Sequence, residues 1–479
     1  MELYPAGLLA LGIWLLVALR DGDRALLAAV VVMPLGMLAA IKVPIGGFTP
    51  PVAQLFAAGA IALALAMRVA RPAPTGLQLP SAAIPLILFS LWGVFSAIVL
   101  VRLFSGELMV FSMSRGHIGA RISPFFPSGL VELRPSASNI SQTAYMLLST
   151  AFFIALADLI RRRGIAPVVT ALRWAAGINI LLALLDAAAL DAVLEIVRTA
   201  SYVLHNEHTV AGVPRVIGGF SEAAPFGAYS AVIGAFFLVR GYDAQDHRDL
   251  SLGIANLLLA AVALSSTAIF GLLVLGLFIA VRRLRRLAVP MPQERAVGTV
   301  LAAVLASLVA VTLITVVIGT DQVLDILDRL IFSKGSSASG LERGALASHG
   351  LGVLWDTYGL GAGIGSVRAN GWTVAIAAST GIIGLTLMVV FLVMAFTTRH
   401  RRAIPPALVP DRAGAQAAGL VSGSVALISA FNAYPDFAIL IFAAIAIGSL
   451  GRQGAAAAPP RPAFLRTAQN DRDHASATV

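Results

Sequence analysis

The sequence predicts an all-α fold, a polytopic bundle of about 13 transmembrane helices (range roughly 11–14). Its composition points to this class, because 58% of the 479 residues are hydrophobic and only 12% are charged. An ordinary soluble domain carries about twice that charged share. Apolar runs also recur along most of the chain, and most are long enough to cross a hydrocarbon core of about 30 Å as a helix.

The apolar runs place the expected helices in order along a single transmembrane domain, residues 1–450. The first run follows Glu2 and no basic residues, so we interpret it as a true span and not as a cleavable signal peptide. The expected spans are residues 5–19, 25–41, 51–68, 81–102, 142–160, 166–186, 223–240, 249–265, 267–281, 296–319, 371–397, 414–433 and 436–450. The polar, alanine- and proline-rich tail at 451–479 is expected to be disordered.

Basic residues predict the orientation of the bundle. Of the 34 lysines and arginines, 22 fall on one side of the expected spans and 11 on the other. The positive-inside rule places the richer side in the cytoplasm, so the N-terminus is expected outside and the C-terminus inside the inner (plasma) membrane of a bacterium. Attraction of these arginines to anionic lipids accounts for most of the net charge of +10, and no nucleic-acid partner is needed.

Three outer (periplasmic) loops are expected to be long, at about 103–141, 187–222 and 320–370. Loops held by a rigid scaffold commonly carry function, so any chemistry is expected to face outward. Apolar stripes at helical spacing predict a short amphipathic helix in two of these loops, one along Val323–Ile331 and one along Leu190–Leu204. Each is expected to lie along the membrane surface or to cap a cavity.

Cysteine is absent, which excludes disulfides, thiolate metal sites and a cysteine nucleophile. The outer histidines His205 and His208 flank Glu207, but HExxH spacing is missing, and pairing or structural roles are favoured over a metal site. We therefore expect no metal and no cofactor. The expected spans also lack the chain of buried carboxylates that a proton-coupled carrier needs.

Two outer arginines are candidates for binding an anion. Arg215 lies in Pro-Arg-Val-Ile-Gly-Gly-Phe-Ser-Glu, directly before the span that starts near Ala223, where a guanidinium and free helix N–H groups suit a phosphate. The alternative is an interfacial arginine paired with Glu222. Arg343 follows a Ser/Gly run and either binds the anion or is an ordinary surface residue.

A glycine-rich segment, Gly359 to Gly365, follows Arg343. It lacks the lysine and the preceding strand of a nucleotide loop, so Gly363 and Gly365 are expected to let the backbone turn tightly against a ligand or neighbouring helices. Arg368 and Asn370 stand at the start of the next span. His349 comes six residues after Arg343, about 240° away on one straight helix. Both could face one ligand only if Gly350 or Gly352 breaks that helix.

In this order the segments resemble the bacterial O-antigen ligase and polysaccharide polymerase superfamily, the Wzy/WaaL-like membrane glycosyltransferases. The resemblance covers about residues 205–395 and rests on Arg-x-x-Gly-Gly-Phe-Ser-Glu running into a helix, a Ser/Thr hairpin, a basic loop, and an outer loop with Ser, Arg, Trp and Gly-x-Gly-x-Gly-Ser. It implies a GT-C-like bundle in which Arg215 and Arg343 contact the pyrophosphate of a polyprenyl-linked (undecaprenyl-type) sugar donor. The implied reaction is a metal-independent, inverting hexosyl transfer at the periplasmic face, with Glu222 or Asp356 as a possible base.

Within this superfamily the ligase branch has a histidine after the glycine segment, and none follows Gly365 here. This departure favours a polymerase of O-antigen or exopolysaccharide repeat units, working with a chain-length regulator as a possible partner. An O-antigen ligase, which transfers the glycan to lipid A–core of lipopolysaccharide, is the alternative. A lipid-linked oligosaccharide flippase or secondary transporter is the alternative of another class, and Arg173 inside a span is the residue that keeps it open.

Overall fold

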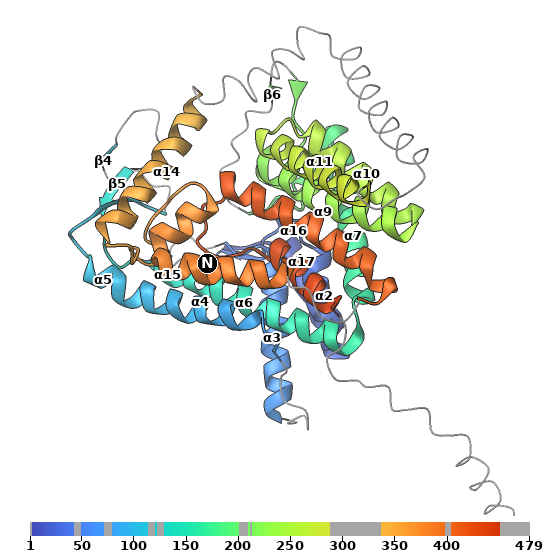
Figure 1. Cartoon of the computed structure of the whole chain (residues 1–479), viewed down its shortest axis with the longest axis horizontal. Helices are drawn as coiled ribbons and strands as arrows, with labels where there is room; N and C mark the ends of the chain where they lie inside the picture. The colour runs from blue at the N-terminus through green and yellow to red at the C-terminus, as the bar shows by residue number, and fades with distance from the viewer. Residues whose placement is uncertain are drawn as a thin grey trace, which may run out of the picture.

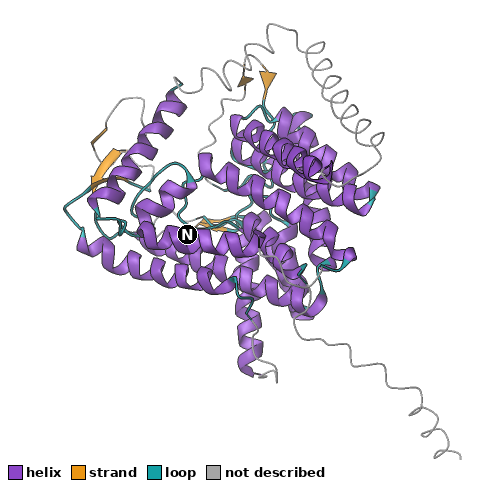
Figure 2. Ribbon diagram, viewed as in Figure 1, coloured by secondary structure: helices purple, strands orange, loops and turns teal. Residues whose placement is uncertain are grey.

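The computed structural model is a bundle of helices with a few short strands at its edges (Figures 1 and 2). The structure describes residues 2–42, 49–70, 79–113, 120–121, 129–200, 209–210, 213–287, 337–397 and 404–450. The expected span at 296–319, the amphipathic stripe at 323–331 and the tail at 451–479 lie outside the described residues.

Seven helices among the described residues are long and apolar enough to cross a membrane. They agree with the expected spans to within a few residues at most ends, which confirms the prediction of a largely helical chain with several candidate membrane helices. They are α3 (Val52–Ala70), the continuous α4, η2 and α5 (Ala83–Phe95, Ser96–Leu100 and Val101–Leu103), α6 (Ala137–Arg163), α7 (Ala166–Ala187), α9 (Ala223–Ala244), α11 (Ser266–Leu287) and α15 (Trp372–Thr397).

The other described helices are shorter or more polar. The number of spans therefore stays a prediction. These helices are α1 (Pro5–Arg20), α2 (Gly22–Val31), α8 (Asp191–Leu194), α10 (His247–Val262), α14 (Ala338–Asp356), η5 (Pro406–Leu408), α16 (Val409–Ser429) and α17 (Phe437–Gly448).

The expected span at 25–41 is wrong as a continuous helix. Helix α2 ends at Val31, after ten residues, and a helix of that length rises only about 15 Å. Pro34 comes three residues later and has no N–H to continue the helical ladder. The chain then turns back, and the N–H of Met37 donates to the carbonyl of Gly219 at 3.0 Å. This half-helix therefore delivers a loop to the segment that carries Arg215.

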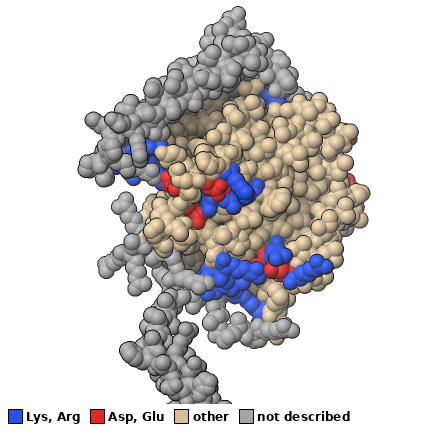
Figure 3. All heavy atoms as spheres, turned by 90° about the vertical axis from the view of Figure 1, so that its right-hand side faces the viewer, with Lys and Arg blue, Asp and Glu red and all other residues tan. Residues whose placement is uncertain are grey.

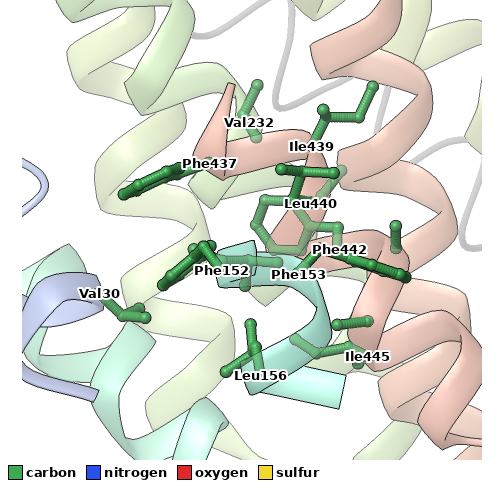
Figure 4. Packing of buried hydrophobic residues seen from close by; sticks show 14 of the residues in the cluster. Val30, Phe152, Phe153, Leu156, Val232, Phe437, Ile439, Leu440, Phe442 and Ile445 are labelled. Carbon is green, nitrogen blue, oxygen red and sulfur yellow. The ribbon is translucent and has the colours of Figure 1, made fainter. Parts of the chain in front are cut away.

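Helix α17 forms the centre of the apolar core. Nine of its 12 residues are buried, and the ring of Phe437 stacks on Phe152 of α6 with 4.2 Å between centroids. Figure 4 shows α6 and α17 interdigitating, with Val232 of α9 and Val30 of α2 at the edges. At about 18 Å, α17 is too short to span a bilayer unaided, so the surrounding helices enclose it.

Short antiparallel strands occupy the connections, which an all-α prediction does not include. The expected loop at 103–141 holds a three-stranded sheet in the order β3-β5-β4. The strands are β1 (Glu2–Leu3), β2 (Ile41–Lys42), β3 (Met109–Phe111), β4 (Ala120–Arg121), β5 (Gly129–Glu132), β6 (Thr209–Val210) and β7 (Val213–Pro214).

The amphipathic helix expected along Leu190–Leu204 is reduced to the single turn α8. Beyond it the backbone leaves the helix, because the N–H of Ala200 donates to the carbonyl of Met37 at 2.8 Å. The Arg198 side chain turns to Gly218 and Asp186. Leu204 lies outside the described residues.

One end of the bundle carries most of the described ion pairs, and we call it the arginine-rich end. It includes the C-terminal ends of α6 and α9 and the N-terminal ends of α7 and α10. Figure 3 views this end, and acidic and basic side chains gather there in patches on a largely uncharged surface. Asp249, whose side chain is fully buried, sits between Arg173 and Arg240. The connections that carry the candidate site lie at the opposite end.

Candidate functional site

The Arg215 segment leads from β7 into α9. The Nε atom of Arg215 donates to the carbonyl of Ala263 at 3.3 Å, in the tight connection between α10 and α11. Ser265 in this connection is buried, and its carbonyl accepts from the N–H of Ile269. The contact places the half-buried Arg215 beside the Ser/Thr hairpin tip, at the end of the bundle opposite the arginine-rich one.

Glu222 is the N-cap residue of α9, with an extended backbone. Its side chain makes no capping hydrogen bond, and no ion pair joins it to Arg215 among the described residues. The structure therefore lacks the Arg215–Glu222 ion pair on which the alternative interpretation rests. The start of α9 combines a guanidinium, a carboxylate and the positive end of a 22-residue helix.

Asp186 and Arg198 hold the backbone between Arg215 and Glu222. The carboxylate of Asp186 accepts from the N–H groups of Ile217 and Gly218, and Arg198 donates to the carbonyl of Gly218. The sequence alone assigned no role to either residue. Neither residue has a motif around it, because its partners are backbone atoms about 20 to 30 residues away.

The glycine-rich segment packs into the bundle. Gly359, Gly361, Gly363 and Gly365 all have positive φ, between 79° and 94°. A Cβ on Gly363 would lie 2.2 Å from Val101 Cγ2, and one on Gly365 would lie 2.4 Å from the carbonyl oxygen of Ser138. These glycines let the backbone approach α5 and the start of α6. Of the two expected reasons for them, the close approach to neighbouring helices is the one visible here.

Arg368 and Asn370 end this segment just before α15, and both are buried. The guanidinium of Arg368 lies over the ring of Phe431 at 5.0 Å, and its backbone N–H donates to the carbonyl of Phe111. Asn370 Nδ2 donates to the carbonyl of Ile428 at 3.2 Å. Asn370 Oδ1 is buried and has no partner within the described residues.

Helix α14 presents Arg343. Ser337 caps this helix by accepting from the N–H of Gly340, and the helix packs against α15 and β3. Arg343 shares a face with Leu346, three residues on, and Gly350, seven residues on, both of which are buried. The residue is half-buried, and its guanidinium makes no hydrogen bond or ion pair with any residue that the structure describes.

His349 points in another direction from the same helix. Its ring meets Phe111 of β3 edge-on, with 4.9 Å between centroids. Because α14 runs unbroken through Gly350 and Gly352, Arg343 and His349 face different sides, and they do not converge on one atom. Burial lowers the pKa of His349, against the opposing influence of a Met109 backbone hydrogen bond and the charge of Asp356.

Glu342 is a residue that sequence reasoning missed. It lies seven residues before His349, and seven residues make two helical turns to within about 20°, so both share a face of α14. Glu342 Oε1 and His349 Nε2 are buried and have no partner in the described part of the chain. The heptad spacing Glu342–His349–Asp356 is a signal in the sequence that could have found this stripe.

The structure does not bring all the candidates into one cluster. Gly363, Gly365, Arg368 and Asn370 belong to one buried segment, whereas Arg215 and Glu222 adjoin the α10–α11 connection. Figure 1 shows α14 at the left and α9, α10 and α11 at the upper right. Among described residues no direct contact joins Arg215 to Arg343. A ligand that touched both would have to bridge these two parts of the bundle.

The residues that the structure describes contain no cluster of three or more histidine, aspartate or glutamate side chains suited to a metal ion. An open pocket of about 330 Å³ is lined by Tyr242, Asp243, Gln245, Pro406, Val409 and Pro410. It lies at the C-terminal end of α9, whereas Arg215 and Glu222 precede the N-terminal end. This pocket is separate from the candidate site.

Comparison with known proteins gives no family assignment. No protein-family model matches the chain, and no curated protein matches it.

Proposed function

We propose that the chain is a membrane glycosyltransferase that polymerises oligosaccharide repeat units carried on a polyprenyl diphosphate. The observation that carries the proposal is Arg343, a half-buried residue whose guanidinium has no partner among the described residues. A guanidinium without a protein partner is available to an anionic ligand. A diphosphate supplies such an anion, and a guanidinium binds it through two parallel hydrogen bonds.

Arg215 supports the proposal from the other side of the bundle. It precedes α9, where the helix dipole and the first backbone N–H groups favour an anion. A diphosphate on a long lipid is a large ligand, and two separate arginines suit it better than one. Apolar helices around the site give the polyprenyl chain a hydrocarbon environment.

The reaction follows from the charges. A sugar hydroxyl of the acceptor attacks the anomeric carbon, the bond from that carbon to the diphosphate oxygen breaks, and the configuration inverts. Arg215 and Arg343 stabilise the negative charge that develops on the leaving diphosphate. The hydroxyl proton passes to a base, for which Glu222 is a candidate because its carboxylate has no ion-pair partner within the described ranges.

Loss of the arginines tests the proposal. Arg215→Ala and Arg343→Ala are expected to lower the rate of chain extension by about 10²–10³, the usual cost of removing one group that stabilises developing charge. Arg343→Lys should recover only part of the rate, because an ammonium cannot form the bidentate pair. The assay is polymer length in membranes supplied with a polyprenyl-diphosphate-linked repeat unit.

Arg134→Ala is the matched control, since this arginine is 71% exposed and its ion pair among the described residues is with Glu132 in its own connection. It should leave the rate unchanged. Full-length polymer from both Arg215→Ala and Arg343→Ala, at wild-type protein levels, would show that the proposal is wrong.

The acceptor distinguishes polymerase from ligase. The segment between Gly365 and α15 contains Arg368 and Asn370 but no histidine, which favours the polymerase. Loss of a polymerase leaves single repeats on the carrier lipid, whereas loss of a ligase leaves finished polymer there. Analysis of the lipid-linked material in cells that lack the chain therefore separates the two.

A flippase or transporter has less support. Arg173, the intramembrane charge that kept this reading open, pairs with Asp246 at 2.8 Å and with Asp249 at 2.6 Å. These pairs give it a structural role at the arginine-rich end. Accumulation of a lipid-linked oligosaccharide in vesicles, without formation of a glycosidic bond, would favour transport instead.

A further inference from the structure

We propose that Asp186 and Arg198 act as a positioning clamp for the segment that carries Arg215 and Glu222. The inference rests on the proposed function, because it concerns how the Arg215 guanidinium is held in place. Neither clamp residue is expected to touch the substrate. Their effect on the reaction passes through the backbone of Ile217 and Gly218.

Asp186 lies at the end of α7 and takes three donors. Its Oδ2 atom accepts from the N–H of Ile217 at 2.6 Å and from the N–H of Gly218 at 3.0 Å. Its Oδ1 atom accepts from Arg198 Nη2 at 2.5 Å. Hydrogen bonds to an ionised acceptor are about twice as strong as those between neutral groups.

Arg198 binds the carbonyl side of the Gly218 residue whose N–H Asp186 binds. Both Nε and Nη2 donate to the carbonyl oxygen of Gly218, at 2.9 Å and 2.6 Å. The N–H and the carbonyl of Gly218 are therefore bound by the two partners of one ion pair. The side chains of Arg198 and Asp186 are only 12% and 10% exposed, so water competes little for these bonds.

The chain around Gly218 has little freedom to compensate. Gly218 has a φ of +54°, and a Cβ on Gly219 would lie 2.3 Å from the carbonyl oxygen of Pro34. The N–H of Met37 donates to the Gly219 carbonyl at 3.0 Å. The α2–β2 connection therefore packs against one side of this segment. Asp186 and Arg198 bind its other side.

This placement explains why the clamp matters for Arg215. The guanidinium-bearing residue comes two positions before Ile217, and Glu222 comes three positions after Gly219. Misplacing a catalytic group by about 1 Å can cost on the order of 10²-fold in rate. The clamp binds the peptide groups of Ile217 and Gly218, which lie between Arg215 and Glu222. It therefore sets the position of both of these residues relative to the start of α9.

A merely structural ion pair would have a different signature. Buried salt bridges are weak evidence for stability in themselves, so a loss of activity alone would not separate the two roles. The chain contains no cysteine, and a nitroxide attached through Ser221→Cys can therefore report the mobility of this segment alone. The probe measures the clamp whether or not the protein is a glycosyltransferase.

The experiment places Arg198→Ala, Arg198→Lys, Asp186→Ala and Asp186→Asn in the nitroxide-labelled protein in detergent or nanodiscs. The alanine variants are expected to sharpen the spectrum of the label and to lower kcat/KM for the lipid-linked repeat about ten- to a hundredfold, mainly through kcat. The conservative variants, which keep part of the hydrogen bonding, should lie between. The double variant Asp186→Ala/Arg198→Ala should lose no more activity than either single variant, because both act on one peptide.

Arg215→Ala in the same assay keeps the two proposals apart. If Arg215→Ala stays fully active, the proposed function fails, and the label spectra still decide whether the clamp exists. If Arg215→Ala is inactive while the clamp variants have full activity or an unchanged label spectrum, the clamp is overturned. Should the alanine variants fail to fold, Arg198→Lys and Asp186→Asn give the same decision from a smaller change.

Discussion

At the scale of the residue, His349 shows how burial sets a protonation state. Its ring packs on Phe111, and desolvation disfavours the charged imidazolium, so its pKa lies below the ordinary value of 6.5. The neutral imidazole is then the form present at neutral pH. In the unfolded chain the same side chain takes up a proton at a higher pH, which links its burial to the pH dependence of stability.

His349→Gln is expected to flatten that pH dependence. Between the lowered folded pKa and about 6.5 the unfolded state binds more protons, so wild-type stability falls as the pH decreases through this window. Thermal unfolding of the detergent-solubilised protein at pH 5 and pH 8 measures the difference. His247→Gln, at an exposed position at the start of α10, is the control and should keep the wild-type difference in Tm. An equal difference in His349→Gln would show that another group titrates.

The position of the candidate residues was predictable where a motif stood beside a helix start. Arg215 and Glu222 lie where the Gly-Gly-Phe-Ser-Glu pattern places them, directly before α9. Asp186 and Arg198 were not predictable in this way. They bind backbone peptide groups, and every residue has such groups, so no sequence motif identifies their partners. Glu342 lay one residue from the singled-out Arg343, and only the helical face of α14 gives it significance.

At the scale of the element, α14 and the glycine-rich segment that follows it show two different uses of glycine. Gly363 has a φ of +94° and no room for a Cβ beside Val101 and Ser96. Gly344 lies on α14 with open space where its Cβ would be. The first glycine is required by backbone geometry and packing, whereas the second only loosens a helix.

Gly363→Ala and Gly344→Ala should therefore change stability in opposite directions. Gly363→Ala is expected to lower the free energy of unfolding by roughly 1–3 kcal/mol through strain and overlap. Gly344→Ala is expected to raise it by about 0.5–1 kcal/mol, because alanine is the better helix former. Paired denaturation curves measure both. Loss of activity in Gly363→Ala at unchanged stability would assign this glycine to ligand contact instead.

The boundaries of the elements were predictable where hydropathy and helix formation coincide. The expected spans at 166–186 and 371–397 correspond to Ala166–Ala187 and Trp372–Thr397. Hydropathy and helix formation disagree at 25–41, where the apolar run continues past Pro34 but the helix has already ended. Hydropathy measures how long a segment stays apolar, and it does not register the missing N–H that ends α2.

At the scale of the whole molecule, the arginine-rich end is held together by buried ion pairs that join distant helices. Asp249 of α10 binds Arg173 of α7 and Arg240 of α9, and Arg240 also binds Asp411 of α16 at 2.6 Å. Four helices therefore share one network. The expected spans placed Arg240 on the basic side and Arg173 inside a span, and they did not predict that carboxylates on neighbouring helices compensate both.

Asp249→Ala is expected to be among the most destabilising single substitutions at this end. It leaves two partly buried guanidinium groups without their shared carboxylate, a loss of about 3–5 kcal/mol for a broken buried pair. Arg24→Ala is the control, since Arg24 is 77% exposed and pairs with Asp21 at 3.6 Å. It should cost less than about 1 kcal/mol. Chemical denaturation of both variants decides, and equal losses would contradict a central role for Asp249.

The short helix α17 has a consequence for biosynthesis. It follows every other described helix in the chain, yet α6, α15 and α16 pack against it. During synthesis the surfaces that contact α17 stay exposed to lipid or to an insertion factor until α17 leaves the ribosome. A 12-residue helix has little tendency to insert alone, so it must enter a groove that its predecessors already form. Among the described helices α17 is therefore the last to pack, and chains cut before Phe437 are expected to be degraded readily by membrane proteases.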